Sequence, residues 1–590
     1  MTYTLLNYQR EAQHTDRYDT RLGLSMHLAL AKDQEAFQPL NQNFGVLFAK
    51  GISLADGFIV AKALKKTWLC ATEERFVIAG IRVNADGTLD ETSVGSILLF
   101  ETENFVQYRE LPLLNLGEMP LLDLQLTYTD GTFEIRWLNS REEAYRITTT
   151  NLHQVDLANK EPLTWEKAEP VKTTIEGALP RNALTISDAL GDYLTKKMLI
   201  PHNCNVEVPS EVNVTSFDEL ADVKAVLHYS DGSSREAAID WFTVPTETTS
   251  GSQIEVQGKV HQEHYAFPIA THRADPCIGK WQGDYYFIAT NDYDENHSLF
   301  IRKAKSIPEL VTAQEMKILD STMYPEIGNL LWAPEFHIIN DRLYIFHAAT
   351  PGPFEEEQSH VMALKEGGNP LLQADWERPR KVLKADGSPL ITGGITLDMT
   401  VIKDSGRYFV AWSQRQFFPV DLGAWIYFAE LDPATPWQLL TEPVVLSKPD
   451  YGWDNNHTFV DEGPYALYHG DQIFLTISGA AIDSTYCVGY LQATRGSDLL
   501  DPASWTKSNY PILTALSVPG EFGPGHNAYV TDDEGNVWNT YHARPGIDAP
   551  RSSGIRRVHF DVEGYPVLGM TEELDVNPEL AVVTLTVNVK

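Results

Sequence analysis

The sequence predicts an all-β protein. We expect a five-bladed β-propeller in the C-terminal half, preceded by an immunoglobulin-like β-sandwich and a degenerate, propeller-like, β-rich N-terminal region. Two observations support this prediction. A pattern of apolar strand, tight turn and aromatic strand recurs five times after residue 270, and short alternating strands separated by turns fill most of the remaining chain. The expected domains are residues 1–165, 166–265 and 266–590.

The five copies of the repeat each open on a polar residue. These residues are Asp275, Glu335, Asp398, Glu462 and His526, so successive copies are 60, 63, 64 and 64 residues apart. This length suits a propeller blade of four short strands with generous loops. Because the first strand of every blade lies beside the central axis, we expect the opening residues to converge on one funnel. The terminal strands GIRRVHFDVEGYPVL and NPELAVVTLTVNVK are expected to complete the propeller region.

The two regions before the propeller are predicted from weaker patterns. Residues 1–165 repeat the blade pattern, but the acids are mostly missing: Trp68 lies near the first expected acid, and only Asp123 occupies a comparable opening. A non-catalytic propeller fragment is the interpretation. Residues 166–265 contain VEVPSEVNVT, VKAVLHYSDGSSREAAIDWFTV and SQIEVQGKV, whose alternation is typical of a sandwich. A spacer role is expected there, with carbohydrate binding as the alternative.

Composition argues against several classes of partner. The formal charge of −35 makes binding to nucleic acid or to an anionic membrane surface unfavourable. The four cysteines are far apart and form no C-x-x-C pair, which favours reduced thiols over disulfides or zinc ligands. The segment MTYTLLNYQREAQHTDRYD lacks a basic stretch followed by an apolar run, so the prediction is a cytoplasmic protein. The oligomeric state is left open.

Three of the opening residues have the chemistry that glycoside cleavage requires. The reaction needs one protonated carboxyl at the leaving oxygen and one ionised carboxylate across the sugar. In an inverting enzyme the pair stands about 6.5 to 9.5 Å apart, so that a water molecule fits between base and anomeric carbon. Carboxylates on separate blades can hold this spacing. Asp275, Asp398 and Glu462 are therefore the candidate catalytic residues.

The motifs around these acids resemble glycoside hydrolase family 43. RADPCI at 273–278 is similar to that family's general-base motif, LDMTVIKDSGRYFVAWS at 397–413 to its second-aspartate strand, and VDEGPYALYHGDQIFLTIS at 460–478 to its general-acid strand. The resemblance implies a five-bladed catalytic propeller. It further implies that Asp275 activates water, that Glu462 protonates the leaving group, and that Asp398 raises the pKa of that acid and orients it.

The same resemblance assigns further residues to the site. Trp332 and Glu335, in LWAPEF, are expected to bind substrate, as is His526 in GPGHNAYV. His542, in NTYHARP, is expected to hold a calcium ion in the propeller channel, although the chemistry requires no cofactor.

An arginine near the acid is also implied, and three candidates fall in the right region. Arg551 is the predicted one, with Arg556 and Arg557 as alternatives.

The substrate prediction rests on the loops. Family members remove α-L-arabinofuranose or β-D-xylose, and IATNDYDENHSLFIRKAKSIPEL and WAPEFHIINDRLYIFHAATPG are more similar to the exo-acting arabinofuranosidases. The prediction is an inverting, exo-acting glycoside hydrolase that releases α-L-arabinofuranose from arabinan or arabinoxylan oligosaccharides. With a cytoplasmic location, short, imported oligosaccharides are the expected substrates. The alternatives are a β-D-xylosidase on xylo-oligosaccharides and a non-catalytic carbohydrate-binding propeller. A retaining, fructan-cleaving propeller is disfavoured because its W-N-D-P opening is absent at residues 273–276.

Overall fold

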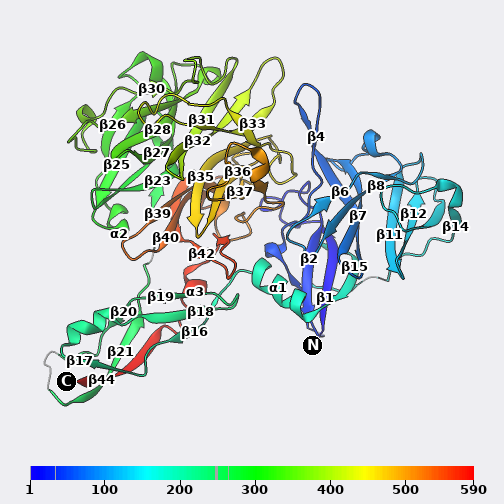
Figure 1. The fold of residues 1–590 in the computed structure, drawn as a ribbon, viewed down its shortest axis with the longest axis horizontal. Coiled ribbons are helices and arrows are strands. Elements are labelled where there is room, and N and C mark those ends of the chain that lie inside the picture. The colour runs from blue at the N-terminus through cyan, green and yellow to red at the C-terminus, as the bar shows by residue number, and fades with distance from the viewer. Residues whose placement is uncertain (1, 34, 170, 246–249, 264) are drawn as a thin grey trace.

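Five four-stranded antiparallel sheets between residues 270 and 557 form the propeller (Figure 1). The structure is a computed structural model that describes residues 2–33, 35–169, 171–245, 250–263 and 265–590. The innermost strands contact one another in chain order, and the last of them, β39, contacts the first, β23, which closes the ring. The predicted all-β propeller is confirmed.

Each blade contains four strands, ordered from the propeller axis outward. Blade 1 comprises β23 (Arg273–Trp281), β24 (Asp284–Asn291), β25 (Ser298–Ala304) and β26 (Met316–Asp320), with the short helix α2 (Ile307–Leu310) between the last two. Blade 2 comprises β27 (Asn329–Ile339), β28 (Arg342–Thr350), β29 (Gln358–Ala363) and β30 (Arg380–Lys381). Blade 3 comprises β31 (Gly394–Asp404), β32 (Arg407–Gln416), β33 (Gly423–Glu430) and β34 (Val444–Ser447). Blade 4 comprises β35 (Asp461–His469), β36 (Gln472–Gly479), β37 (Cys487–Thr494) and β38 (Thr506–Lys507). Blade 5 comprises β39 (Phe522–Thr531), β40 (Val537–Arg544), β41 (Ser552–Arg557) and, from the other end of the propeller, β22 (Ala270–Thr271).

A smaller unit of two sheets precedes the propeller in the chain. One sheet contains β16 (Asn203–Glu207), β18 (Ala225–Tyr229) and β19 (Ser234–Ala237); the other contains β17 (Glu211–Val214), β44 (Val582–Val589), β21 (Gln253–Val260) and β20 (Ile239–Trp241). Buried side chains from both sheets share one cluster. Strand β44 runs parallel to β17 and antiparallel to β21, so the chain's last strand lies here and not in the propeller, to which the sequence assigned it. The immunoglobulin-like topology stays a prediction.

The N-terminal region contains three further antiparallel sheets. The first contains β15 (Ala178–Ile186), β1 (Tyr3–Arg10), β2 (His27–Lys32) and β3 (Gln38–Pro39). The second contains β10 (Leu114–Asn115), β8 (Ser96–Thr102), β7 (Phe76–Asn84), β6 (Lys62–Ala71) and β9 (Arg109–Glu110). The third contains β11 (Leu121–Thr129), β12 (Thr132–Asn139), β13 (Ala144–Thr149) and β14 (Glu161–Leu163). Because β15 pairs with β1, this region extends beyond the predicted boundary at residue 165. Helix α1 (Asp188–Met198) follows, with Ser187 as its N-cap.

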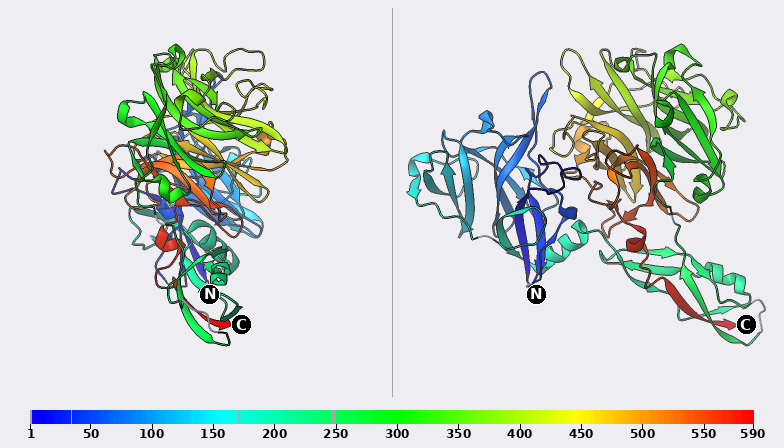
Figure 2. Two further views of the ribbon diagram at one scale, coloured as in Figure 1. Left: turned by 90° about the vertical axis from the view of Figure 1, so that its left-hand side faces the viewer. Right: turned by 180° about the vertical axis from the view of Figure 1, so that it is seen from behind.

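The N-terminal region packs directly on the propeller. Tyr18, Phe44 and Phe48 share a buried cluster with Phe409 of β32 and with Trp453. A hairpin of β4 (Ile52–Ser53) and β5 (Ile59–Val60) projects from this region toward blade 3 (Figure 1). Figure 2 shows the N-terminal region and the two-sheet unit on different sides of the propeller. The two regions therefore contact the propeller through separate surfaces.

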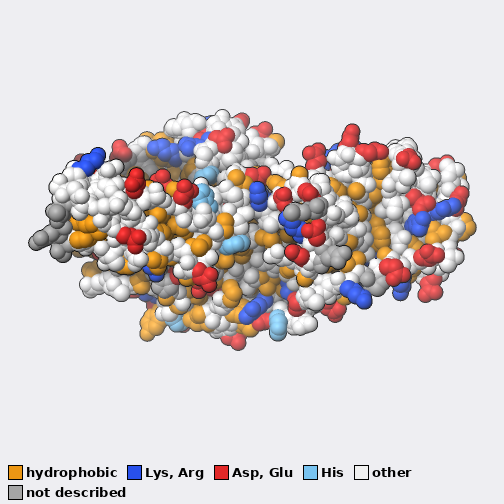
Figure 3. Space-filling model, turned by 90° about the horizontal axis from the view of Figure 1, so that it is seen from below, with side chains coloured by type: hydrophobic (Ala, Val, Ile, Leu, Met, Phe, Trp, Pro, Cys, Tyr) orange, Lys and Arg blue, Asp and Glu red, His pale blue; other side chains and the backbone are white. Residues whose placement is uncertain are grey.

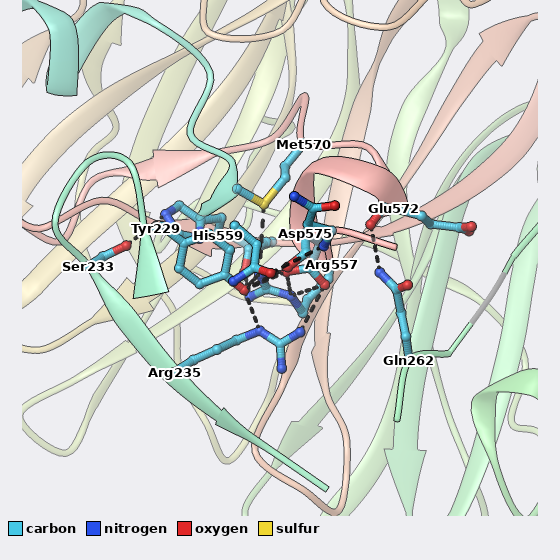
Figure 4. Close-up of polar contacts among 12 residues, drawn as sticks. Tyr229, Ser233, Arg235, Gln262, Arg557, His559, Met570, Glu572 and Asp575 are labelled. Carbon is cyan, nitrogen blue, oxygen red and sulfur yellow. Dashed lines mark hydrogen bonds and ion pairs between the residues drawn. The ribbon is translucent and has the colours of Figure 1, made fainter. Parts of the chain in front are cut away.

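An ionic cluster joins the two-sheet unit to blade 5 (Figure 4). Asp575, in the short helix α3 (Glu572–Asp575), accepts hydrogen bonds from Arg557 and from Arg235 at 3.0 Å, and from the Tyr229 hydroxyl at 2.8 Å. Burial alone would raise the pKa of Asp575, but the two arginines outweigh it and lower that pKa. Arg557 is therefore committed to this junction.

The surface agrees with the acidic composition. Asp and Glu side chains are spread over the face in Figure 3 and do not gather in one patch. None of the helices in the described ranges has both the length and the apolar character needed to cross a membrane.

Candidate active site

A β-bulge at the same position of every innermost strand builds the site. The pairing with the second strand shifts between Ala274 and Cys277, and at the equivalent place in the other four blades. At each shift one residue has a positive φ: 50° at Asp275, 44° at Ala333, 56° at Asp398, 55° at Gly463 and 52° at His526. For a residue other than glycine this conformation costs about 1–2 kcal/mol. Bulges of this kind redirect side chains and are common beside active sites.

The bulge also explains why Glu335 does not lie beside the other residues that open the repeats. In strand register Glu335 is equivalent to Cys277 and Thr400, on the far side of the bulge, whereas Trp332 is equivalent to Glu462. Glu335 is 3% exposed and lies 2.7 Å from His337 Nε2. It is not among the residues that line the central pocket of the propeller, so its predicted contact with substrate is corrected.

The bulges surround this pocket, a cavity of about 270 Å³. Six of the predicted residues line it, with side chains from all five blades: Asp275, Trp332, Asp398, Glu462, His526 and Arg551. The remaining lining residues are Phe354, Ile395, Leu397, Ser413, Arg415, Ala424, Thr458, Val460, Ala480 and Ile482. The convergence that the repeat predicts is therefore present for four of its opening residues, Asp275, Asp398, Glu462 and His526, and the other two side chains are ones that the resemblance implied.

Asp275 lies in a setting that stabilises its ionised form. Thr290 donates a hydrogen bond to Oδ2 at 2.7 Å, and Arg551 Nη1 lies 3.4 Å from Oδ1. His526 Nδ1 and His542 Nδ1 lie 3.3 and 3.0 Å from the same oxygen. Burial opposes ionisation, but His526, Arg551 and His542 together hold the pKa of Asp275 well below its usual value.

Arg551 supplies the permanent charge in this group. Burial lowers the pKa of His526, and it lowers the pKa of His542 to about 4, so neither imidazole keeps a positive charge as firmly as the guanidinium of Arg551. Two parallel hydrogen bonds of 3.0 and 2.9 Å to Asp292 fix the guanidinium of Arg551 in place. Asp275 is thus a carboxylate held beside an anchored cation.

Glu462 lies in the opposite kind of setting. Burial raises its pKa to about 7, the hydrogen bond from the Tyr486 hydroxyl at 2.7 Å lowers it, and the charge of Asp275 raises it again. The ring of Tyr486 stacks on His542 with centroids 5.6 Å apart. Glu462 therefore retains a proton at a pH at which Asp275 has lost its own.

Asp398 is coupled to Glu462. It is 3% exposed and accepts a hydrogen bond from the backbone N–H of Gly463 at 3.0 Å. Burial raises the pKa of Asp398 well above its usual value, and the neighbouring Glu462 and Asp275 raise it further. Glu462 and Asp398 therefore oppose each other's ionisation.

The three candidate arginines differ in their positions relative to the pocket. Arg551 precedes β41 and faces the pocket, whereas Arg556 and Arg557 lie at the other end of that strand. Arg556 pairs with Glu521 at 2.6 Å, and Arg557 pairs with Asp575. The predicted residue, Arg551, is the one that contacts a catalytic candidate.

Several pocket residues were not predicted. Tyr486, Asp292 and Thr290 each contact a predicted side chain, and Arg415 and Phe354 line the cavity. None of them opens a repeat: Thr290 and Arg415 lie on second strands, Asp292 and Phe354 in short 3-10 helices, and Tyr486 in the loop before β37. The motif RQF at 415–417, in which an arginine stands close to an aromatic residue, was the one local signal available.

No cluster of three or more His, Cys, Asp or Glu side chains suited to a metal ion occurs among the described residues. His542 is 1% exposed, and its Nε2 atom has no hydrogen-bond partner among them. That nitrogen fits a single imidazole ligand whose remaining coordination comes from water.

A propeller that gathers an ionised carboxylate, a protonated carboxyl and a modulating acid in one pocket has the apparatus of a glycoside hydrolase. Residues 265–566 match the model of Glycosyl hydrolases family 43. The chain belongs to that family.

Three known proteins are similar to the chain. It is 33% identical over 325 residues to the "Extracellular exo-alpha-(1->5)-L-arabinofuranosidase" of Streptomyces avermitilis, covering 53% of this chain and 64% of that protein. It is 32% identical over 284 residues to the protein of the same name from Streptomyces chartreusis, covering 48% and 82%. The crystal structure of an alpha-L-arabinofuranosidase from Lactobacillus brevis has 30% identity and a TM-score of 0.46, covering 52% and 96%. The chain thus spans less than two thirds of the S. avermitilis relative.

These relatives correct the predicted location. Both Streptomyces proteins are named extracellular, which contradicts the cytoplasmic location and the role with imported oligosaccharides inferred from the N-terminal residues. Leader segments are removed from mature chains, so the N-terminal residues of a folded enzyme do not record where it works.

Proposed function

We propose that this protein is an inverting, exo-acting α-L-arabinofuranosidase that releases arabinofuranose from arabinan or arabinoxylan oligosaccharides. The observation that carries the proposal is that two carboxyl groups in one pocket have pKa values shifted in opposite directions. The pKa of Asp275 is lowered, and that of Glu462 is raised to about 7. Opposed pKa shifts of this kind separate base from acid. The names of the relatives support the choice of sugar.

In the proposed reaction Asp275 takes a proton from water as that water attacks the anomeric carbon. Glu462 gives its proton to the leaving oxygen on the other face of the sugar, so the configuration inverts. Asp398 is a positioning residue: it accepts a hydrogen bond from Gly463, next to Glu462, and opposes the ionisation of that acid. Trp332, His526 and Arg551 line the walls that hold the sugar.

The direct test compares hydrolysis of p-nitrophenyl α-L-arabinofuranoside and p-nitrophenyl β-D-xyloside. We expect preference for the arabinofuranoside, and release of the β-anomer from an α-linked oligosaccharide in proton NMR spectra taken before mutarotation. A preference for the xyloside would keep the reaction class and change the sugar to xylose. Retention of configuration would refute the inverting mechanism, and no turnover of either compound would refute the proposed activity.

The pH dependence of kcat/KM should be asymmetric. Glu462 must be protonated, so activity is present below pH 7 and is lost as pH rises through about 7. Asp275 must be ionised, and its lowered pKa places the acidic limb below pH 4. The check is kcat/KM between pH 3 and 9, within the range where circular dichroism shows a folded protein. An alkaline limb above pH 9 would contradict the assignment of Glu462.

Substitution Tyr486→Phe should move the alkaline limb upward. The Tyr486 hydroxyl stabilises ionised Glu462, so its removal raises the pKa of Glu462 and extends activity by about one pH unit. Tyr529→Phe is the matched control, because Tyr529 bonds Thr476 at 3.2 Å and touches no catalytic carboxyl. An unchanged limb in Tyr486→Phe would show that this hydrogen bond does not tune the acid.

The N-terminal hairpin should affect substrate binding. Phe58 packs on Phe459 with ring centroids 6.3 Å apart, and the residues on either side of Phe459, Thr458 and Val460, line the pocket. Phe58→Ala should raise KM for arabino-oligosaccharides about fivefold and change kcat by less than about twofold. Leu54→Ala, an exposed residue of the same hairpin, is the control. Equal values of kcat and KM in the two variants would show that the hairpin does not contribute to substrate binding.

A calcium ion in the channel is proposed through His542, whose buried Nε2 has no partner among the described residues. The ion would act on stability, and the residues assigned to the chemistry do not require it. Thermal unfolding with added calcium or with a chelator tests this assignment, and His542→Gln should remove any difference between the two.

A further inference from the structure

A second and larger cavity lies between the N-terminal region and blade 4. Its volume is about 960 Å³, within the usual range of about 300–1,000 Å³ for ligand pockets. Helix α1 lies between the N-terminal region and the propeller (Figure 1) and contributes Tyr193 to the cavity wall. Tyr490 and Tyr510 come from the outer part of blade 4, and Tyr565 precedes β43 (Pro566–Val567). We call this space the tyrosine cavity.

Six tyrosines line the tyrosine cavity, and the hydroxyls of two of them, Tyr108 and Tyr451, donate hydrogen bonds to Phe105 and Asn509. Tyr193, Tyr490, Tyr510 and Tyr565 are all partly exposed, and within the described ranges their hydroxyls take part in no hydrogen bond. The ring centroids of Tyr490 and Tyr565 lie 6.4 Å apart. Because the four side chains are partly exposed, their hydroxyls are available to water or to a ligand.

Most of the cations on the wall of the tyrosine cavity pair with carboxylates, as Lys50–Asp450 at 3.1 Å, Lys197–Asp561 at 2.7 Å and Lys507–Asp461 at 2.9 Å. Lys448 has no carboxylate partner among the described residues and places its ammonium over the ring of Trp425, 4.3 Å from the centroid. A phosphate or polyanion would find this one unpaired lysine and would have to break an ion pair to reach any other. The wall therefore suits an uncharged ligand.

Aromatic faces combined with free hydroxyls match the chemistry of a sugar. The apolar C–H faces of a sugar ring pack on aromatic rings, and its hydroxyls both donate and accept hydrogen bonds. Side-chain amides of Asn104, Gln107 and Asn509 add further polar groups to the wall. We propose that the tyrosine cavity is a second binding site for neutral oligosaccharide, separate from the catalytic pocket. The proposal rests on the proposed function, because it assigns the same substrate class to a new site.

Binding stoichiometry tests this site. The parent is the full-length Glu462→Gln variant, which retains the fold and stops turnover, titrated calorimetrically with a soluble linear arabino-oligosaccharide. We expect two molecules bound per chain. Gln107→Trp, at an exposed loop position on the cavity wall, should fill the cavity and reduce the number to one. The double change Tyr193→Phe and Tyr510→Phe, which keeps the rings and removes two hydroxyls, should weaken one of the two sites about tenfold.

The control is Gln154→Trp, an exposed position between β13 and β14 at the end of the N-terminal region distant from the propeller (Figure 1). It should leave two molecules bound. One molecule bound to the parent, or two unchanged sites in both cavity variants, would overturn the proposal. Turnover of p-nitrophenyl α-L-arabinofuranoside by the wild type is measured in parallel. Turnover with a single binding site would refute the tyrosine cavity alone, whereas no turnover would refute the proposed function.

Discussion

Replacing Asp275 by alanine should lower kcat about 10³–10⁴-fold for arabinofuranosides with either good or poor leaving groups. The carboxylate activates the attacking water in every turnover, so the quality of the leaving group does not change the need for it. Arg551 keeps its two hydrogen bonds to Asp292 in this variant, so the wall of the pocket is retained. The measurement is kcat on aryl arabinofuranosides and on an oligosaccharide.

Azide provides the control for this result. A small anionic nucleophile needs no base, so it should restore part of the lost activity in Asp275→Ala and none in Glu462→Gln. Thermal unfolding close to that of the wild type would establish that the variant is folded. A loss smaller than about tenfold would contradict the assignment of Asp275 as general base.

Replacing Glu462 by glutamine should give a loss that depends on the leaving group. Oligosaccharides leave as alkoxides that need a proton, so kcat should fall about 10³-fold or more; a dinitrophenyl arabinofuranoside needs none and should lose less than about tenfold. The alkaline limb of the pH profile should disappear with the activated substrate, because the group that titrates at about 7 has been removed.

Asp398→Asn separates acid catalysis from positioning. Asp398 accepts a hydrogen bond from Gly463, next to Glu462, and opposes the ionisation of Glu462, so its loss should slow both substrates to a similar extent and shift the alkaline limb of the pH profile. For the Glu462→Gln variant, equal losses of kcat on the oligosaccharide and on the dinitrophenyl arabinofuranoside would contradict the role of Glu462 as general acid.

The catalytic candidates could be predicted because the repeat is local. Alternation over one hairpin marks each inner strand, and Asp275 and Asp398 occupy the same place in their blades. The position of Glu335 was predicted wrongly because the alternation of apolar and polar residues does not reveal a bulge. Glu335 lies two residues after Ala333, which is the true equivalent of Asp275 in blade 2. The choice among Arg551, Arg556 and Arg557 required the three-dimensional position of β41.

The domain boundaries could not be predicted for a different reason. The patterns of β15 and β44 identify them as strands, but their partners are β1 and β21, far away in the sequence. Local periodicity contains no information about which distant edge a strand will join. The cellular location of the protein could not be predicted either, because neither the folded core nor the acidic surface depends on where the protein works.

The chain's last strand, β44, has a consequence for the order of assembly. Its partners β17 and β21 leave the ribosome before the propeller does, so they must wait with open edges until all five blades have been made. A nascent chain that stalls inside the propeller, or a protein cut before residue 582, would present those edges to other chains. The sheet of the small unit is therefore complete only after β44 has been made, so its stability should be acquired after that of the propeller.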